Sequence, residues 1–161
     1  MQGYHGDASK TFYCGTVDDD AKQLVEVTRE ALDKAIAICG PGVEFKKIGS
    51  TIKCISQQSN QNEIADRYRY GVVDRFVGHG VGAVFHSAPS ILHNRSNQPG
   101  CMVVGQTFTV EISVHLIIYY GCAKPMVTMG SITDVMWNDN WTVVTADGGL
   151  SVQFEDSLLI T

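Results

Sequence analysis

The chain has 161 residues, of which 44% are hydrophobic and 18% charged, with a formal net charge of -5 and a pI of 5.4. This length suits one domain that buries roughly two thirds of its unfolded surface. The net negative charge gives no sign of the basic surface that nucleic-acid binding requires, which argues against nucleic acid as a partner. No apolar run reaches the roughly 18 residues of a membrane-spanning helix, so we expect no membrane partner.

Cysteine usage points to a reducing compartment. The five cysteines stand at positions 14, 39, 54, 101 and 122 and contain no C-x-x-C pair. An odd number without metal-ligand spacing is typical of free thiols rather than of a disulfide framework or a zinc knuckle. No cleavable leader precedes the first motif, and we expect the chain to start inside a domain.

The first predicted elements are a strand end and a helix. Residues 4–14 are expected to end a strand and turn, because residues 11–13 are β-branched or aromatic. Asp18 to Asp20 then place negative charge at the N-terminus of a helix, which Gly40-Pro41-Gly42 ends. Between these signals, apolar and small residues recur at helical spacing: Leu24, Val25, Thr28, Ala31, Leu32, Ala35 and Ile36.

A second helix is predicted to begin near Glu44, with Phe45, Ile48 and Ile52 on one face. The polar run 56–62 lacks apolar spacing and is predicted to be a loop or disordered. From Val72 onward the pattern alternates between strands and turns. This favours the second half of a curved antiparallel sheet that is covered by helices.

Four short stretches combine a carboxylate or an imidazole with apolar, strand-like surroundings. They are residues 4–7 (YHGD), 78–86 (GHGVGAVFH), 108–111 (FTVE) and 153–155 (QFE). Together they offer three carboxylates and a histidine, which is an oxygen-rich ligand set for a transition metal. Their wide separation is typical of ligands gathered by a sheet rather than by a helical motif such as H-E-x-x-H.

The identity and order of these stretches closely resemble the type 1 methionine aminopeptidases of the pita-bread fold. Two longer segments, residues 78–86 and 141–155 (WTVVTADGGLSVQFE), are especially specific for this resemblance. The resemblance covers most of the chain and implies that residues 1–161 form a partial catalytic domain of the M24-like peptidases. The implied fold is α+β and incomplete, with a curved antiparallel sheet flanked by helices.

The resemblance also implies a metal site. Asp7 and Glu155 match the bridging ligands, and His86 and Glu111 match ligands of one ion. Glu111 is in addition the expected proton shuttle. The family binds two divalent ions, and Mn, Fe, Co or Zn all suit this mixed ligand set. A further aspartate that completes the second metal site would fall upstream of Met1, so that site is expected to be incomplete.

Three further residues are assigned to the substrate. His93 matches the family histidine that contacts the scissile peptide, so it is expected to be catalytic and substrate-binding. Trp141 is expected to form a wall of the methionine pocket, and His79 to support the site from a glycine-flanked turn. Taken alone, Asp7 and His79 are more typical of turns, and the interpretation depends on the joint order of the four stretches.

Residues 112–124 interrupt the family pattern. Removing them would join Glu111 to Pro125-Met126-Val127 and restore a family-like Glu-Pro-Met-Val, so we interpret them as an insertion. Val114 to Tyr120 is apolar, β-prone and uncharged, the profile of an aggregation-prone edge. The alternative is a genuine extra strand that pairs with the sheet. His115 lies within this stretch and is not expected to be a ligand.

The expected function is metal-dependent removal of the initiator methionine from nascent proteins and peptides whose second residue is small. The expected partner is such a polypeptide, bound by a monomer that associates with the ribosome. The alternative is a catalytically impaired pseudoenzyme or truncated product that binds without hydrolysing. The texts of residues 75–82 (RFVGHGVG) and 139–141 (DNW) look most like the plant organellar branch, which implies chloroplast or mitochondrion, with the cytoplasm as alternative.

Overall fold

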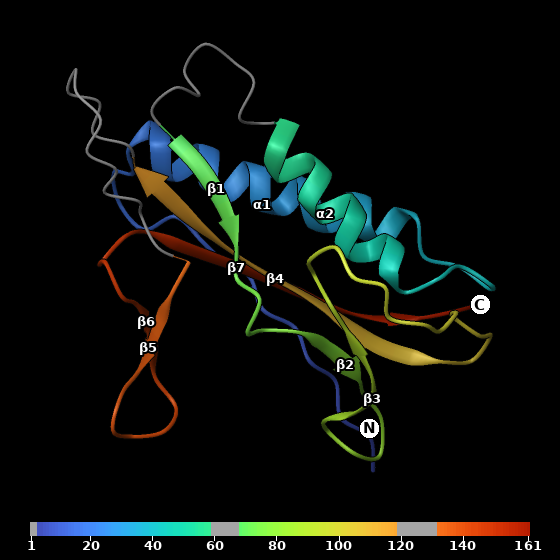
Figure 1. Ribbon diagram of the computed structural model, residues 1–161. Helices are drawn as coiled ribbons and strands as arrows, with labels where there is room; N and C mark the ends of the chain where they lie inside the picture. The colour runs from blue at the N-terminus through green and yellow to red at the C-terminus, as the bar shows by residue number, and fades with distance from the viewer. Residues whose placement is uncertain (1–2, 59–67, 119–131) are drawn as a thin grey trace.

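The computed structural model describes residues 3–58, 68–118 and 132–161. Within these residues, α1 (Asp19–Ala37) and α2 (Lys46–Gln58) lie side by side over one face of a five-stranded antiparallel sheet (Figure 1). The sheet contains β1 (Tyr68–Val72), β2 (Gly78–Gly80), β3 (Ser87–Ile91), β4 (Thr107–Ile118) and β7 (Ser151–Leu159). The predicted α+β architecture with a helix-flanked antiparallel sheet is confirmed.

Both predicted helices are present. The side chain of Asp18 caps α1 by accepting a hydrogen bond from the Ala21 amide at 2.7 Å, and Asp19 and Asp20 lie in the first turn. One stripe of α1 is buried against the sheet: Leu24, Val27, Thr28, Ala31, Leu32 and Ala35. Helix α2 starts at Lys46, close to the predicted start, and extends to Gln58. The expected loop at 56–62 was wrong for residues 56–58, and 59–62 lie outside the described residues.

Strand β4 is the centre of the sheet. It pairs with β7 along one side, and with β1 and β2 along the other. Its even-numbered residues Phe108, Val110, Ile112 and Val114 are buried in the core beneath the helices. Because side chains alternate along a strand, Thr109 and Glu111 lie on the opposite face. That face carries the functional groups.

The described part of the predicted insertion is a strand. Residues 112–118 continue β4 beyond Glu111, with Val114 opposite both Val72 of β1 and Val152 of β7. The backbone of His115 lies between Gly71 and Ser151 in the same ladders. Residues 112–118 are therefore paired with β7 or β1 rather than forming an exposed edge. The interpretation of residues 112–124 as an insertion stays a prediction, and residues 119–124 lie outside the described part.

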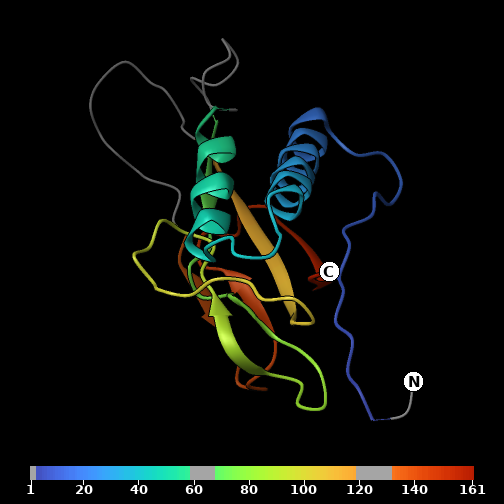
Figure 2. The same ribbon diagram turned by 90° about the vertical axis from the view of Figure 1, so that its right-hand side faces the viewer.

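The N-terminal segment is extended without forming the predicted strand. It runs along the free side of β7, and Figure 2 shows it separated from the helices. Ser9 and Glu155 exchange two backbone hydrogen bonds of 3.1 and 3.0 Å, and the Thr11 hydroxyl donates to the Gln153 carbonyl at 2.9 Å. These contacts place Asp7 beside the sheet.

A separate hairpin projects from the sheet in Figure 1. It consists of β5 (Asp134–Met136) and β6 (Val143–Thr145), and Trp137 and Trp141 stand at the turn. The Asp139 carboxylate orders this turn by accepting bonds from the amides of Trp141 and Thr142. An ion pair between Arg75 and Asp134 links the hairpin to the segment that precedes β2.

Two further features concern the whole described chain. Cys14, Cys39, Cys54 and Cys101 are free thiols. Among the described residues, neither helix combines the length and the apolar character needed to cross a bilayer.

The pairing of residues 112–118 can be tested by replacing Ile112 with alanine. Because Ile112 is fully buried, we expect the free energy of unfolding to fall by about 2–5 kcal/mol. Urea denaturation followed by circular dichroism measures the change. Val104→Ala, at an aliphatic residue that is 69% exposed, is the control and should stay within about 0.5 kcal/mol. A similarly small effect of Ile112→Ala would contradict the buried strand.

Candidate metal centre

The short strand β2 contains His79 between two glycines, Gly78 and Gly80, and these glycines allow it to join the sheet. A Cβ at Gly78 would lie 2.1 Å from the Thr109 carbonyl oxygen, and one at Gly80 would lie 2.3 Å from the Ala88 carbonyl oxygen. Only glycine therefore allows β2 to fit between β4 and β3. The register shifts between His79 and Gly80, an irregularity of the kind that redirects a side chain.

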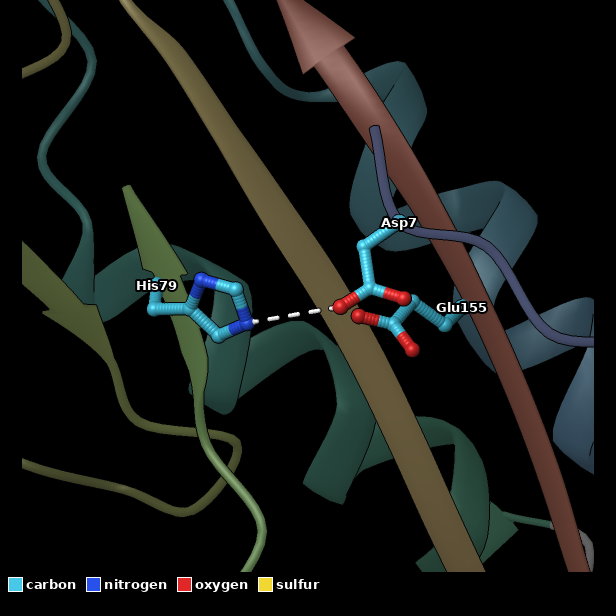
Figure 3. A group of neighbouring side chains, drawn as sticks. All are labelled: Asp7, His79 and Glu155. Carbon is cyan, nitrogen blue, oxygen red and sulfur yellow. Dashed lines mark ion pairs between the residues drawn. The ribbon is translucent and has the colours of Figure 1, made fainter. Parts of the chain in front are cut away.

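Asp7, His79 and Glu155 meet on the face of the sheet opposite the helices. Among the described residues, their candidate ligand atoms form a group in which all lie within 4.8 Å of one another. They come from the N-terminal segment, β2 and β7, and Figure 3 shows the three side chains converging across β4. The Nε2 atom of His79 is 3.8 Å from Oδ2 of Asp7. Three segments far apart in sequence thus build one cluster.

Hydrogen bonds fix the orientation of two of these residues. The Nδ1 atom of His79 lies 3.2 Å from the Gly80 carbonyl, which can only accept, so Nδ1 carries the proton. The Nε2 atom then faces the carboxylates. The Ser157 hydroxyl accepts from the Asp7 amide at 3.1 Å and donates to the Asp7 carbonyl at 2.6 Å, which fixes the backbone of Asp7.

Glu111 lies directly opposite Glu155 in the ladder of β4 and β7. Their two carboxyl groups interact across this pair of strands, and Asp7 adds a further negative charge. Burial, followed by the charge of Glu155, raises the pKa of Glu111 to about 8. Burial likewise raises the pKa of Glu155, against the opposing effect of Glu111. Glu111 therefore holds the proton of this pair near neutral pH.

His86 is close to this cluster but is not one of its three members. Its ring packs edge-on against that of His79, with 4.3 Å between the ring centroids, and the residue is exposed. His79, His86 and Glu111 line an open cleft of about 520 Å³, whose wall also includes Arg75 and Phe76. The cleft thus opens beside the carboxylates.

The other two predicted substrate residues lie away from this cleft. His93 is only 2% exposed, and its Nδ1 atom bonds the Phe76 carbonyl at 3.1 Å. Burial lowers the pKa of His93 to about 4, against the opposing effect of that hydrogen bond. Trp141 is 87% exposed at the turn of the β5–β6 hairpin. The structure does not bring either residue into the cluster.

Of the four residues expected to bind metal, the structure gathers Asp7, Glu111 and Glu155 and leaves His86 at the rim. The nitrogen nearest the carboxylates belongs to His79, which sequence reasoning gave a supporting role. The signal for it was present in the flanking glycines, which mark a close approach of neighbouring strands. Ser157, whose hydroxyl fixes the backbone of Asp7, carried no such signal.

Comparison with known proteins identifies the class. The model of metallopeptidase family M24 matches residues 1–161, and the chain belongs to this family. It is 55% identical over its whole length to methionine aminopeptidase 1D, chloroplastic/mitochondrial, of Arabidopsis thaliana, and covers 40% of that protein. It is 40% identical over 159 residues to the mitochondrial methionine aminopeptidase 1D of Homo sapiens, of which it covers 41%. The expected resemblance to type 1 methionine aminopeptidases is confirmed.

A crystal structure of methionine aminopeptidase from Rickettsia prowazekii matches the whole chain with a TM-score of 0.81 and 32% identity, and 57% of that protein is covered. Prolidase from Pyrococcus furiosus matches with a TM-score of 0.64 and 21% identity, a likeness of fold alone. The pita-bread fold is therefore confirmed, and the chain spans about 40% of the length of the curated relatives it matches.

The raised pKa of Glu111 predicts how stability depends on pH. In the metal-free chain the folded state keeps a proton on Glu111 that the unfolded state, with a pKa near 4.5, has released. The contribution of this proton to the free energy of unfolding is therefore fully present below about pH 4.5. It is lost as the pH rises towards 8, by at most about 1.4 kcal/mol per pH unit for one proton. Urea denaturation between pH 5 and 8 measures this slope. Glu111→Gln cannot ionise and should flatten the slope, whereas an equal slope in both proteins would contradict the raised pKa of Glu111.

Proposed function

We propose that this chain is part of a metal-dependent aminopeptidase that removes the initiator methionine from nascent proteins and peptides with a small second residue. The observation that carries this proposal is the convergence of Asp7, His79 and Glu155, with Glu111 opposite Glu155, in a chain similar to methionine aminopeptidases. The alternative of a pseudoenzyme is not favoured, because the relatives are named as aminopeptidases.

The family implies a divalent metal, and the residues present fit one. The Nε2 atom of His79 and the Oε1 atom of Glu155 are buried and have no hydrogen-bond partner. Buried polar atoms normally have a partner, and a cation held by these two atoms and by Asp7 would supply one. Asp7, His79 and Glu155 would hold the ion, with Glu111 next to them. His79 thus replaces His86 as the proposed nitrogen ligand.

Each side chain has a distinct task in this proposal. A bound divalent ion would make a water molecule more acidic and polarise a peptide carbonyl. Glu111, whose proton is held by burial and by Glu155, is placed to exchange a proton with a substrate in the cleft. His86, exposed on the cleft wall, is placed to hydrogen-bond the substrate's terminal amine or carbonyl.

The identity of the metal and the number of ions are proposals too. Mn, Fe, Co and Zn all suit three carboxylates and one imidazole. We propose two ions in the whole enzyme and a single weakly held ion in this chain, because the second site needs an aspartate upstream of Met1. The names of the Arabidopsis relatives support a chloroplast or mitochondrial location, with the cytoplasm as alternative. Import of the whole protein into isolated organelles would test the location.

The nitrogen ligand can be identified by comparing two histidine variants. We expect His79→Asn to weaken Mn or Co binding by more than about 100-fold, because a ligand costs at least as much as an outer contact to one. His86→Asn, which alters a neighbouring imidazole outside the cluster, is the matched control and should bind within about 3-fold of the unaltered chain. Isothermal titration calorimetry measures both constants. The reverse ranking would restore His86 as the ligand.

For catalysis, we expect this chain alone to hydrolyse Met-Ala peptides slowly or not at all. Losing the second ion removes several kcal/mol of transition-state stabilisation, so the rate should fall by about 10²-fold or more. A longer chain that carries the upstream residues of a relative should recover turnover, and Glu111→Gln should abolish it again. Release of free methionine measures the rates. If the longer chain folds and binds metal but stays inactive, the proposed function is wrong.

A further inference from the structure

The segment that carries Asp7 is held on the free side of β7 in the register of an antiparallel strand. Ser9 and Glu155 exchange two backbone hydrogen bonds, and an antiparallel ladder repeats such pairs every two residues. The next pair would join Asp7 to Ser157. Here the Ser157 hydroxyl takes the place of the partner backbone, because it accepts from the Asp7 amide at 3.1 Å and donates to the Asp7 carbonyl at 2.6 Å.

The same arrangement occurs on the other side of the Ser9–Glu155 pair, with the roles of the two segments exchanged. Thr11 and Gln153 form the next pair there. The Thr11 hydroxyl donates to the Gln153 carbonyl at 2.9 Å and accepts from the Gln153 amide at 3.3 Å. One hydroxyl can make both bonds because it has one O–H donor and two lone pairs. Two hydroxyls thus continue a ladder in which backbone groups alone make only the central pair.

No buried side chain supports this attachment, since none of residues 3–18 is buried. The segment depends on hydrogen bonds that are in contact with water, and each such bond contributes little to stability. His79 and Glu155, in contrast, are buried and belong to strands of the sheet. Asp7 is therefore the member of the cluster whose position depends most on individual hydrogen bonds.

The register fixes the relation between two carboxylates of the cluster. Because Ser9 pairs with Glu155, Asp7 is a diagonal neighbour of Glu155, and the two side chains lie on one face of the sheet (Figure 3). A slip by one residue would turn the Asp7 side chain to the other face. The His5 amide donates to the Gly82 carbonyl at 2.8 Å, which anchors the segment before Asp7 but leaves the backbone of Asp7 itself to the hydroxyl on β7.

We propose that Ser157 and Thr11 are positioning residues for the metal centre, whose hydroxyls hold the N-terminal segment in register on β7 and so keep the Asp7 carboxylate beside Glu155. Metal binding at this cluster rests on the proposed function, whereas the register of the segment exists in the metal-free chain as well. Ser157 has the larger effect because it holds Asp7 itself, and Thr11 acts from four residues away.

The test compares variants that remove or keep each hydroxyl. Ser157→Ala and Thr11→Val remove it, whereas Ser157→Thr and Thr11→Ser keep it. Two controls remove hydroxyls that do not join the segment to β7. Ser151→Ala alters an exposed serine of β7 whose hydroxyl lies 3.4 Å from that of Ser113. Thr16→Val alters an exposed threonine whose hydroxyl makes no hydrogen bond within the described residues.

Two measurements separate the register from metal binding. Calorimetric titration with Mn gives the affinity. Amide hydrogen exchange by NMR in the metal-free chain follows the amides of Asp7 and Gln153, which donate to the two hydroxyls. The amides of β4 report on opening of the whole sheet.

We expect Ser157→Ala to speed exchange of the Asp7 amide and to weaken Mn binding about 10-fold, because contacts that orient a ligand commonly set metal affinity. Thr11→Val should speed exchange of the Gln153 amide and weaken Mn binding less, by about 3-fold. Ser157→Thr and Thr11→Ser should restore both properties. The two controls should change neither, and exchange within β4 should stay the same in every variant.

Equal exchange of the Asp7 amide in Ser157→Ala and in the unaltered chain would overturn the proposal, as would a failure of Ser157→Thr to restore it. Faster exchange throughout β4 would also overturn it, because Ser157 would then support the whole fold rather than one segment. If the unaltered chain binds no Mn, the proposed metal site fails, and exchange alone decides whether the hydroxyls set the register. If Ser157→Ala does not fold, Thr11→Val decides in its place.

Discussion

Glu111 and Glu155 face each other across the ladder of β4 and β7, and the functional face of the sheet is arranged around this like-charge pair. Glu155 is buried and Glu111 partly buried, so two ionised carboxylates here repel each other and each also loses hydration. The fold therefore needs either a proton between them or a cation beside them. Asp7 adds a further carboxylate and makes a cation the more effective solution.

The rest of the sheet is built to hold that pair in place. The core side of β4, with Phe108, Val110 and Ile112, is packed beneath the helices, which fixes the direction of the odd-numbered residues. A shift of the pairing by one residue would move every apolar side chain of β4 to the wrong face. The hydrophobic core thus determines where Glu111 points.

The sequence was sufficient to predict the helices and the carboxylates. The acidic cap at Asp18 and the glycines after residue 39 mark α1, and the order of Asp7, Glu111 and Glu155 predicts their convergence. The choice between His79 and His86 depended on a register shift and on two sub-van-der-Waals approaches that only glycine permits. Neither produces a periodic pattern, so the sequence could not show that His79 lies nearest the carboxylates, and the assignment of His86 as a ligand stays a prediction.

Residues 112–118 illustrate a second limit. An apolar, β-prone run without charge describes both an exposed edge and a strand with partners on two sides, because composition does not specify what lies next to it. Those partners, β1 and β7, come from distant parts of the sequence. The N-terminal segment shows the opposite case. Its residues are also β-prone, but the segment forms only an isolated β-bridge with β7, at Ser9, and no strand.

The β5–β6 hairpin has a practical consequence for spectroscopy. Its turn holds both tryptophans of the chain, and Trp137 and Trp141 are 56% and 87% exposed. Tryptophan emission therefore reports on a solvated turn that an Arg75–Asp134 ion pair links to the sheet. The emission is almost blind to the core, where Tyr70 is the buried tyrosine among the residues whose side chains the structure describes. A fluorescence trace and a circular dichroism trace of this chain would thus describe different events.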